Sequence, residues 1–231
     1  MWSWRKYGEF ARPCPSAAGA TYLPAVATLS GIIYYDFTSV EAFALSEIAA
    51  SFAASVASVA SVVPSVAGAA EFEWRGVEAD PGLPVPMIAL DRWEAARLEV
   101  DVGQMVRRVP SLNVIQPTGR PNTRHALHAV ASVARAHAAR AGEFRVRLFR
   151  EYWNGRADIS SRAVVQKMAD EAGVPRWVDL EDVEAGASLE RWELDWRTER
   201  LGGVPRAIRS DGQILWGVKD EASTREFLLG R

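Results

Sequence analysis

Hydrophobic and polar positions change their spacing along the chain, and the changes predict strands near both ends with helices between them. Residues 31–37, GIIYYDF, are rich in β-branched and aromatic side chains, which is typical of a buried strand. The pattern then predicts a helix over 39–60 and a second strand over 70–79. A strand–helix–strand unit of this length predicts a right-handed crossover and parallel pairing of its two strands.

The middle of the chain has helical spacing throughout. Apolar residues recur every three or four positions from 90 to 201. Asp91 is placed to cap the first of these helices. A second helix is expected to begin with Asn122 or Thr123 as its N-cap and to end with Gly142 as its C-cap.

Strand character returns near the carboxyl terminus. Residues 204–209 and 213–218 read as short strands joined by Ser-Asp-Gly, which is a hairpin turn signal. An amphipathic helix follows over 220–229 and ends at Gly230. The whole order is therefore β-α-β, a block of helices, and β-β-α.

This order predicts an α/β fold of the thioredoxin-like type, in which a four-stranded mixed sheet carries one helix on each face and a large all-helical insertion interrupts the core. The predicted parts are an N-terminal extension over 1–30, a core formed by 31–89 and 202–231, and a helical insertion domain over 90–201.

Composition and charge limit the kinds of partner that the chain is expected to bind. The 231 residues carry a formal net charge of -2 at pH 7, with both signs interspersed, so the chain has no electrostatic attraction for nucleic acid or anionic membrane. Cys14 is the single cysteine, which excludes an internal disulfide and a C-x-x-C pair. Such cysteine use fits a reducing compartment, and we expect a cytoplasmic location.

Two segments have features that bear on targeting or membrane insertion. Residues 1–30 lack the continuous apolar core of a secretory signal and read as an extension held by Trp2 and Trp4. Residues 48–70 carry no charge, but five serines, Pro64 and the absence of a basic flank argue against a membrane span. The alternative is a helix packed under the sheet, followed by a loop of small residues.

Four segments resemble a known family. They are YYDFTSVEAF at 34–43, PNTRHAL at 121–127, LFREYWNGRADISSRAVVQKMADEAGV at 148–174 and GVPRAIRSDGQILWG at 203–217. In order and spacing they are similar to segments of the 2-hydroxychromene-2-carboxylate isomerase and kappa-class glutathione transferase group. This group belongs to the DsbA-like division of the thioredoxin superfamily.

The resemblance implies where a site would lie. Ser39 takes the position of the family's first active-site residue, which is Cys in disulfide oxidoreductases and Ser in the isomerase and kappa-transferase group. Ala42 falls where oxidoreductases have their second Cys. Val204-Pro205 would be the cis peptide that faces the site, where the Val204 backbone could pair with an extended thiol peptide.

The sequence also departs from that group. Val40 and Glu41 replace the usual proline and aromatic residue after the serine, and a glutamate here would raise the pKa of a bound thiol. The family's Ser-Asp pair, which holds the γ-glutamyl end of glutathione, is replaced by Val218-Lys219, with Asp220 one place late.

These residues exclude one chemistry and permit another. Dithiol-disulfide exchange needs an attacking and a resolving thiol, and Ser39 and Ala42 supply neither. A serine hydroxyl at a helix N-terminus can instead stabilise the thiolate of a bound cofactor. We therefore expect a thiol-dependent isomerase or transferase, with glutathione or another low-molecular-weight thiol, no metal, and a small aromatic or electrophilic substrate.

The residues around Ser39 also allow two other interpretations, a purely structural helix cap and a non-catalytic binding module. Thr38 and Glu41 would also form a capping box for the helix, with Thr38 as N-cap, which needs no ligand. The chain could be a redox-inactive relative of the oxidoreductases that serves as a peptide- or ligand-binding module. We expect neither nucleic-acid nor membrane partners and leave a homodimer open.

Other side chains offer weaker signals. His125 and His128 lie three residues apart on one helix face and could begin a metal site, although no third ligand has a readable spacing. The remaining candidates are arginines that could meet an anionic substrate and tryptophans that could line an apolar pocket, namely Arg92, Arg120, Arg124, Trp93, Trp153 and Trp216.

Overall fold

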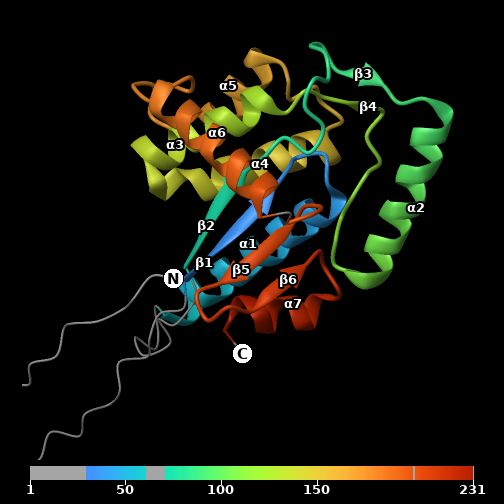
Figure 1. Ribbon diagram of the computed structural model, residues 1–231, viewed down its shortest axis with the longest axis vertical. Coiled ribbons are helices and arrows are strands. Elements are labelled where there is room, and N and C mark those ends of the chain that lie inside the picture. Colours follow the sequence, from blue (N-terminus) through green and yellow to red (C-terminus); the bar gives the residue numbers. More distant parts are fainter. Residues whose placement is uncertain (1–29, 61–70, 200, 231) are drawn as a thin grey trace, which may run out of the picture.

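The computed structural model describes residues 30–60, 71–199 and 201–230, without the side chains of 54–60. Its main sheet contains β1 (Ser30–Tyr35), β2 (Glu71–Gly76), β5 (Arg206–Arg209) and β6 (Ile214–Trp216). The strands lie in the order β2-β1-β5-β6 (Figure 1). β1 pairs with β2 in parallel, whereas β5 is antiparallel to both β1 and β6. The predicted mixed four-stranded sheet, its parallel pair and the C-terminal hairpin are thus confirmed.

The two core helices share one face of this sheet. They are α1 (Val40–Ala60) and α7 (Glu221–Leu228), which contact each other and join Ile33 and Ala207 in one hydrophobic cluster. The opposite face carries Tyr34, against which Trp192 and Trp196 of α6 (Val183–Thr198) pack. The prediction of one core helix on each face is therefore wrong, because the insertion supplies the cover for the second face.

The insertion also differs from the predicted pattern. Its other helices are α2 (Arg92–Arg108), α3 (Arg124–Ala136), α4 (Ala138–Trp153) and α5 (Arg162–Glu171). A short antiparallel ribbon of β3 (Ile88–Ala89) and β4 (Gly119–Arg120) borders α2, so the segment from 90 to 201 is not helical throughout (Figure 1).

The predicted single helix up to Gly142 is two helices. α3 ends at Ala136, and His137 leaves the helical region with φ -153° and ψ 64°. Its N–H still caps α3 by donating to the Val133 carbonyl at 2.7 Å. Gly142 lies inside α4 and ends no helix.

Aromatic side chains join α4 of the insertion to the junction between β1 and α1. The Phe43 and Trp153 rings are stacked with centroids 5.9 Å apart, and Phe37 lies 4.7 Å from Phe149. The indole Nε1–H of Trp153 donates to the Phe37 carbonyl at 3.0 Å. The insertion therefore fixes the backbone immediately before Ser39.

Several predictions concern segments that the structure describes in part or not at all. α1 continues to Ala60, so the start of the uncharged stretch 48–70 is helical as expected. Residues 61–70 and the extension 1–29, with Trp2, Trp4 and Cys14, lie outside the described residues. Within the described residues, no helix has the length and apolar character needed to cross a membrane.

Candidate functional site

Ser39 joins the start of α1 to the residue before a cis-proline. Its carbonyl accepts the Phe43 N–H at 3.0 Å, and its hydroxyl accepts the Ala42 N–H at 3.2 Å, which makes Ser39 the N-cap of α1. The same hydroxyl donates to the Val204 carbonyl at 3.0 Å. The Val204-Pro205 peptide is cis, as the resemblance implies. The two segments that the family motifs single out are thus in direct contact.

The predicted capping box is wrong. Both the hydroxyl and the backbone N–H of Thr38 donate to Asp36 Oδ1, each at 2.7 Å, so Thr38 is not the N-cap. The Glu41 carboxylate pairs with Arg108 at 3.2 Å and does not reach back to the chain before the helix. Both donors of Thr38 bind Asp36, because a carboxylate two residues earlier can close a local turn. Ser39 therefore serves as the N-cap in place of Thr38.

Asp36 is a buried carboxylate that the motif reading did not single out. Its side chain is 1% exposed and accepts four hydrogen bonds, the two from Thr38, one from the Ala79 N–H at 2.8 Å and one from the Thr123 hydroxyl at 3.1 Å. Burial raises its pKa, and these hydrogen bonds oppose the rise. An acid directly after a buried strand is the sequence signal that could have found it. Asp36 ties the end of β1 to the loop after β2 and to the start of α3.

The Val204 backbone has one group left for a ligand. Its carbonyl accepts from Ser39, and the next carbonyl, of Pro205, accepts the Gly217 N–H at 3.1 Å. No acceptor for the Val204 N–H is found within the part of the chain that the structure describes. This N–H is therefore free to pair with an extended ligand beside Ser39.

A pocket of about 290 Å³ lies beside Ser39, between the start of α1 and the insertion helix α2. It is lined by Thr38, Ser39, Val40, Glu41, Leu98, Asp101, Gln104, Met105 and Arg108. Neither Val204 nor Asp220 lines it. The structure thus places Ser39 at a pocket whose other wall belongs to the insertion, and a functional role for this pocket stays a prediction.

The charges of this pocket are mixed. Burial raises the pKa of Glu41 and Asp101 raises it further, whereas the nearby Arg108 guanidinium lowers it. Arg108 also donates to the Val218 carbonyl at 3.3 Å. Gly217, with φ +64°, lies against the Glu41 carboxylate, and a side chain at this position would collide with it. Glu41 and Arg108 thereby connect the pocket to the loop after β6.

Asp220 serves as the N-cap of α7. Its two carboxylate oxygens accept from the Ser223 N–H and the Ser223 hydroxyl, both at 2.8 Å. These hydrogen bonds lower its pKa. No contact between Asp220 and Ser39 is found among the described residues, so the structure gives Asp220 a capping role and does not place it at the serine.

The weaker candidates have structural partners. His125 lies 3.5 Å from the Glu181 carboxylate, and the Nε2 of His128 lies 2.8 Å from the Asp182 carbonyl oxygen. Among the described side chains, no group of three or more His, Cys, Asp or Glu is arranged to hold a metal ion. Arg120 and Arg124 pair with carboxylates, Trp153 is fully buried, and Trp93 and Trp216 are exposed.

Comparisons with known proteins identify the fold. No family model matches the chain, and no match is found among curated proteins. Solved structures do match: a putative protein disulfide isomerase from Nitrosomonas europaea is 12% identical with a TM-score of 0.61, covering 87% of this chain and 96% of its own. The cytosolic disulfide reductase DsbM from Pseudomonas aeruginosa with GSH is 15% identical with a TM-score of 0.62, covering 87% and 97%.

A third match is a 2-hydroxychromene-2-carboxylate isomerase, 14% identical with a TM-score of 0.58, covering 87% of this chain and 95% of its own. All these likenesses extend over the core and the insertion together. The chain therefore has the DsbA-like thioredoxin fold with a helical insertion, as predicted. At such low identities the likeness establishes the fold, and the chemistry must be argued from the residues of the site.

Proposed function

We propose that the chain binds a low-molecular-weight thiol of the glutathione class beside Ser39 and uses it as an isomerase or transferase on a small aromatic or electrophilic substrate. The observation that carries this proposal is the position of the Ser39 hydroxyl, at the N-cap of α1, at a pocket of about 290 Å³ and next to the cis peptide. The fold neighbours named as an isomerase and as a reductase with GSH are consistent with it.

The start of α1 offers donors to a thiolate. In the described structure the Val40 and Glu41 N–H groups have no acceptor, and both residues line the pocket. Free amides and the positive end of a helix of 21 residues favour an anion at this point. The Ser39 hydroxyl would add a third donor, and it would act by stabilising the sulfur without becoming a nucleophile itself.

Thiolate binding requires a change at Ser39. A hydroxyl carries one proton and can donate one hydrogen bond, which is now directed at the Val204 carbonyl. Donation to a thiolate would release that carbonyl. The carbonyl and the N–H of Val204 would then both be available to pair with the backbone of an extended thiol peptide beside Pro205. A cofactor role for Asp220 stays a prediction.

Glu41 is expected to weaken thiolate binding. Replacing it with glutamine removes a negative charge from the pocket and leaves Arg108 unpaired, and both changes favour an anion. We expect Glu41→Gln to increase the affinity for glutathione by about 3- to 10-fold at a pH where the thiolate predominates. Isothermal calorimetry measures this. Glu47→Gln is the matched control on the same helix, because Glu47 pairs with Arg150 outside this pocket and should leave the affinity unchanged.

A second candidate function is a non-catalytic binding module. Two observations favour it: the Ser39 hydroxyl already has partners for both its donor and its acceptor, and the Glu41–Arg108 ion pair lines the pocket. Such a module would use the free Val204 N–H beside the cis peptide to bind a peptide and would need no thiol.

Calorimetry with glutathione and other small thiols separates the two functions. Wild type should bind glutathione, and Ser39→Ala should weaken binding by about 10-fold through the loss of one donor to the sulfur. Asp182→Ala is the control for the loss of a helix cap, because it removes the N-cap bond of α6 without touching the pocket. Absence of binding by every thiol tested would contradict the thiol proposal, and equal binding by Ser39→Ala would remove Ser39 from the site.

A further inference from the structure

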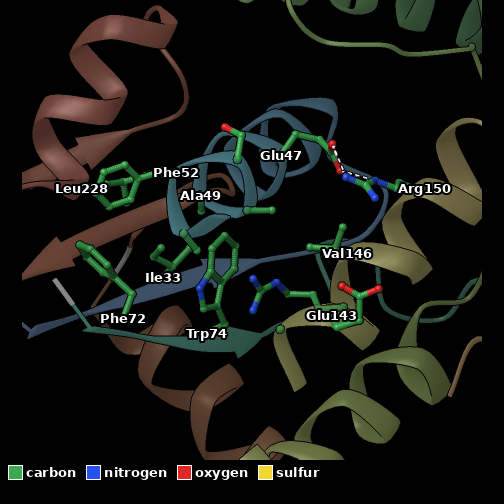
Figure 2. Close-up of a pocket in the computed structure, with 15 residues that line it drawn as sticks. Ile33, Glu47, Ala49, Phe52, Phe72, Trp74, Glu143, Val146, Arg150 and Leu228 are labelled. Carbon is green, nitrogen blue, oxygen red and sulfur yellow. Dashed lines mark hydrogen bonds and ion pairs between the residues drawn. The ribbon is translucent and has the colours of Figure 1, made fainter. Parts of the chain in front are cut away.

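A second pocket, of about 560 Å³, lies under the sheet and shares no lining residue with the pocket beside Ser39. Its walls come from α1, from β1 and β2, from α4 and from the end of α7 (Figure 2). The larger apolar side chains of its lining are Ile33, Phe52, Phe72, Trp74, Val146 and Leu228. The pocket has the volume of a small-molecule site.

Arg145 of α4 lines this pocket as a buried cation that has no anionic partner among the described residues. It is 7% exposed, and its guanidinium lies over the Trp74 ring, 3.6 Å from the centroid. Its buried Nε has no hydrogen-bond partner, and no carboxylate pairs with its guanidinium among the described residues. Burial lowers the pKa of Arg145 to about 10. A buried charge in this condition is unfavourable unless an anion joins it.

The carboxylates at the pocket are already paired with other arginines. Glu47 accepts from Nε and from a terminal nitrogen of Arg150, both at 2.9 Å. Glu143 accepts from Arg147 at 2.8 Å. Outside the described residues the chain has one acidic side chain, Glu9, besides its terminal carboxyl group. The pocket therefore has a cation whose counter-charge the described structure does not supply.

The pocket is polar at one end and apolar at the other. Figure 2 shows Phe52, Phe72 and Leu228 toward one end and Glu143 and Arg150 toward the other, with Ile33, Trp74 and Val146 between them. A ligand that matches this distribution is elongated, with an anionic head and an apolar tail.

We propose that this pocket binds a medium-chain aliphatic carboxylate, with its carboxylate on the guanidinium of Arg145 and its tail toward Phe52, Phe72 and Leu228. A carboxylate matches the fork of guanidinium donors and supplies the missing charge. The apolar side chains at the far end bury the methylene groups, whose removal from water favours binding. This site is independent of thiol binding at Ser39.

Calorimetry with decanoate tests the proposal. Wild type should bind decanoate at one site, and Arg145→Met should weaken binding by about 10- to 100-fold, because methionine keeps the length of the side chain and removes its charge. Decanol, with the same tail and no charge, should bind wild type about as weakly as decanoate binds Arg145→Met. Arg140→Met is the matched control on the same helix, since Arg140 is exposed and does not line the pocket, and it should bind decanoate as wild type does.

Thermal unfolding provides a readout that does not depend on heats of binding. Without ligand, Arg145→Met should unfold at a higher temperature than wild type, because it removes an unpaired buried charge. Decanoate should raise the unfolding temperature of wild type and leave that of Arg145→Met unchanged. Failure of wild type to bind decanoate, or equal binding by folded Arg145→Met, would overturn the proposal.

Discussion

Asp36→Ala is expected to lower the free energy of unfolding by about 3 kcal/mol. The Asp36 carboxylate accepts four hydrogen bonds, and its loss leaves the Thr38 N–H and the buried Thr123 hydroxyl without an acceptor. The end of β1, the loop after β2 and the start of α3 lose their common partner. Urea unfolding followed by circular dichroism measures the change.

Two variants serve as controls for Asp36. Asp91→Ala removes an exposed N-cap of α2 and should cost only about 1 kcal/mol. Asp36→Asn keeps one oxygen for Thr38 and should cost less than Asp36→Ala. Because burial raises the pKa of Asp36, its contribution to stability declines as pH rises from the unfolded to the folded pKa, and Asp36→Asn should lack this decline. Equal costs for Asp36→Ala and Asp91→Ala would contradict the account.

Trp153→Ala is expected to lower the free energy of unfolding by about 4 kcal/mol. Trp153 is 0% exposed, stacks on Phe43, and donates from Nε1 to the Phe37 carbonyl. The substitution leaves a large cavity between the insertion and the core, and it leaves that carbonyl without its donor. Equilibrium unfolding in guanidinium chloride measures the loss.

Trp93→Ala is the matched control for Trp153. Trp93 is 80% exposed on α2, so its removal should change the free energy of unfolding by less than about 0.5 kcal/mol. A similar loss for both tryptophans would show that the interface between core and insertion does not depend on the packing around Trp153.

The sequence predicted the core of the fold because local patterns are strong there. β1 (Ser30–Tyr35) covers most of the strand predicted over 31–37, and Ser-Asp-Gly joins β5 to β6, as expected. The ribbon of β3 and β4 was missed because two residues a strand carry no periodic pattern. The break at His137 was missed because alanines on both sides keep helical composition and no glycine or proline marks it.

The contact between Ser39 and Val204 could be expected from the family motifs, whereas the hydrogen bonds around it could not. The family motifs located Ser39 and Val204, and the structure brings them into contact. The cap was assigned to Thr38 because sequence cannot show that Asp36 takes the Thr38 donors. The sequence could not show the burial of Arg145 for a related reason. This burial comes from the packing of α4 against Trp74, which lies far away in the sequence. The hydrogen-bond partners of Thr38 and the burial of Arg145 both depend on the folded structure, which local sequence patterns do not specify.

The proposed reaction needs a sulfur atom that the residues at the start of α1 do not supply. Ser39 and Ala42 carry no thiol, so the sulfur in the proposed reaction must come from a bound cofactor. The start of α1 offers donors to that sulfur, whereas Glu41 opposes its ionisation. The affinity for the thiolate form thus depends on two opposing effects, stabilisation by the start of α1 and destabilisation by the Glu41 carboxylate.

The pKa of the thiol of glutathione in the complex tests the central claim most directly. The thiolate absorbs in the ultraviolet, so a pH titration of glutathione with excess protein reports its ionisation. We predict a pKa below the ordinary value of about 8.5 for a cysteine thiol, with a return toward that value in Ser39→Ala. A bound thiol whose pKa equals or exceeds that of free glutathione would contradict thiolate stabilisation by the start of α1.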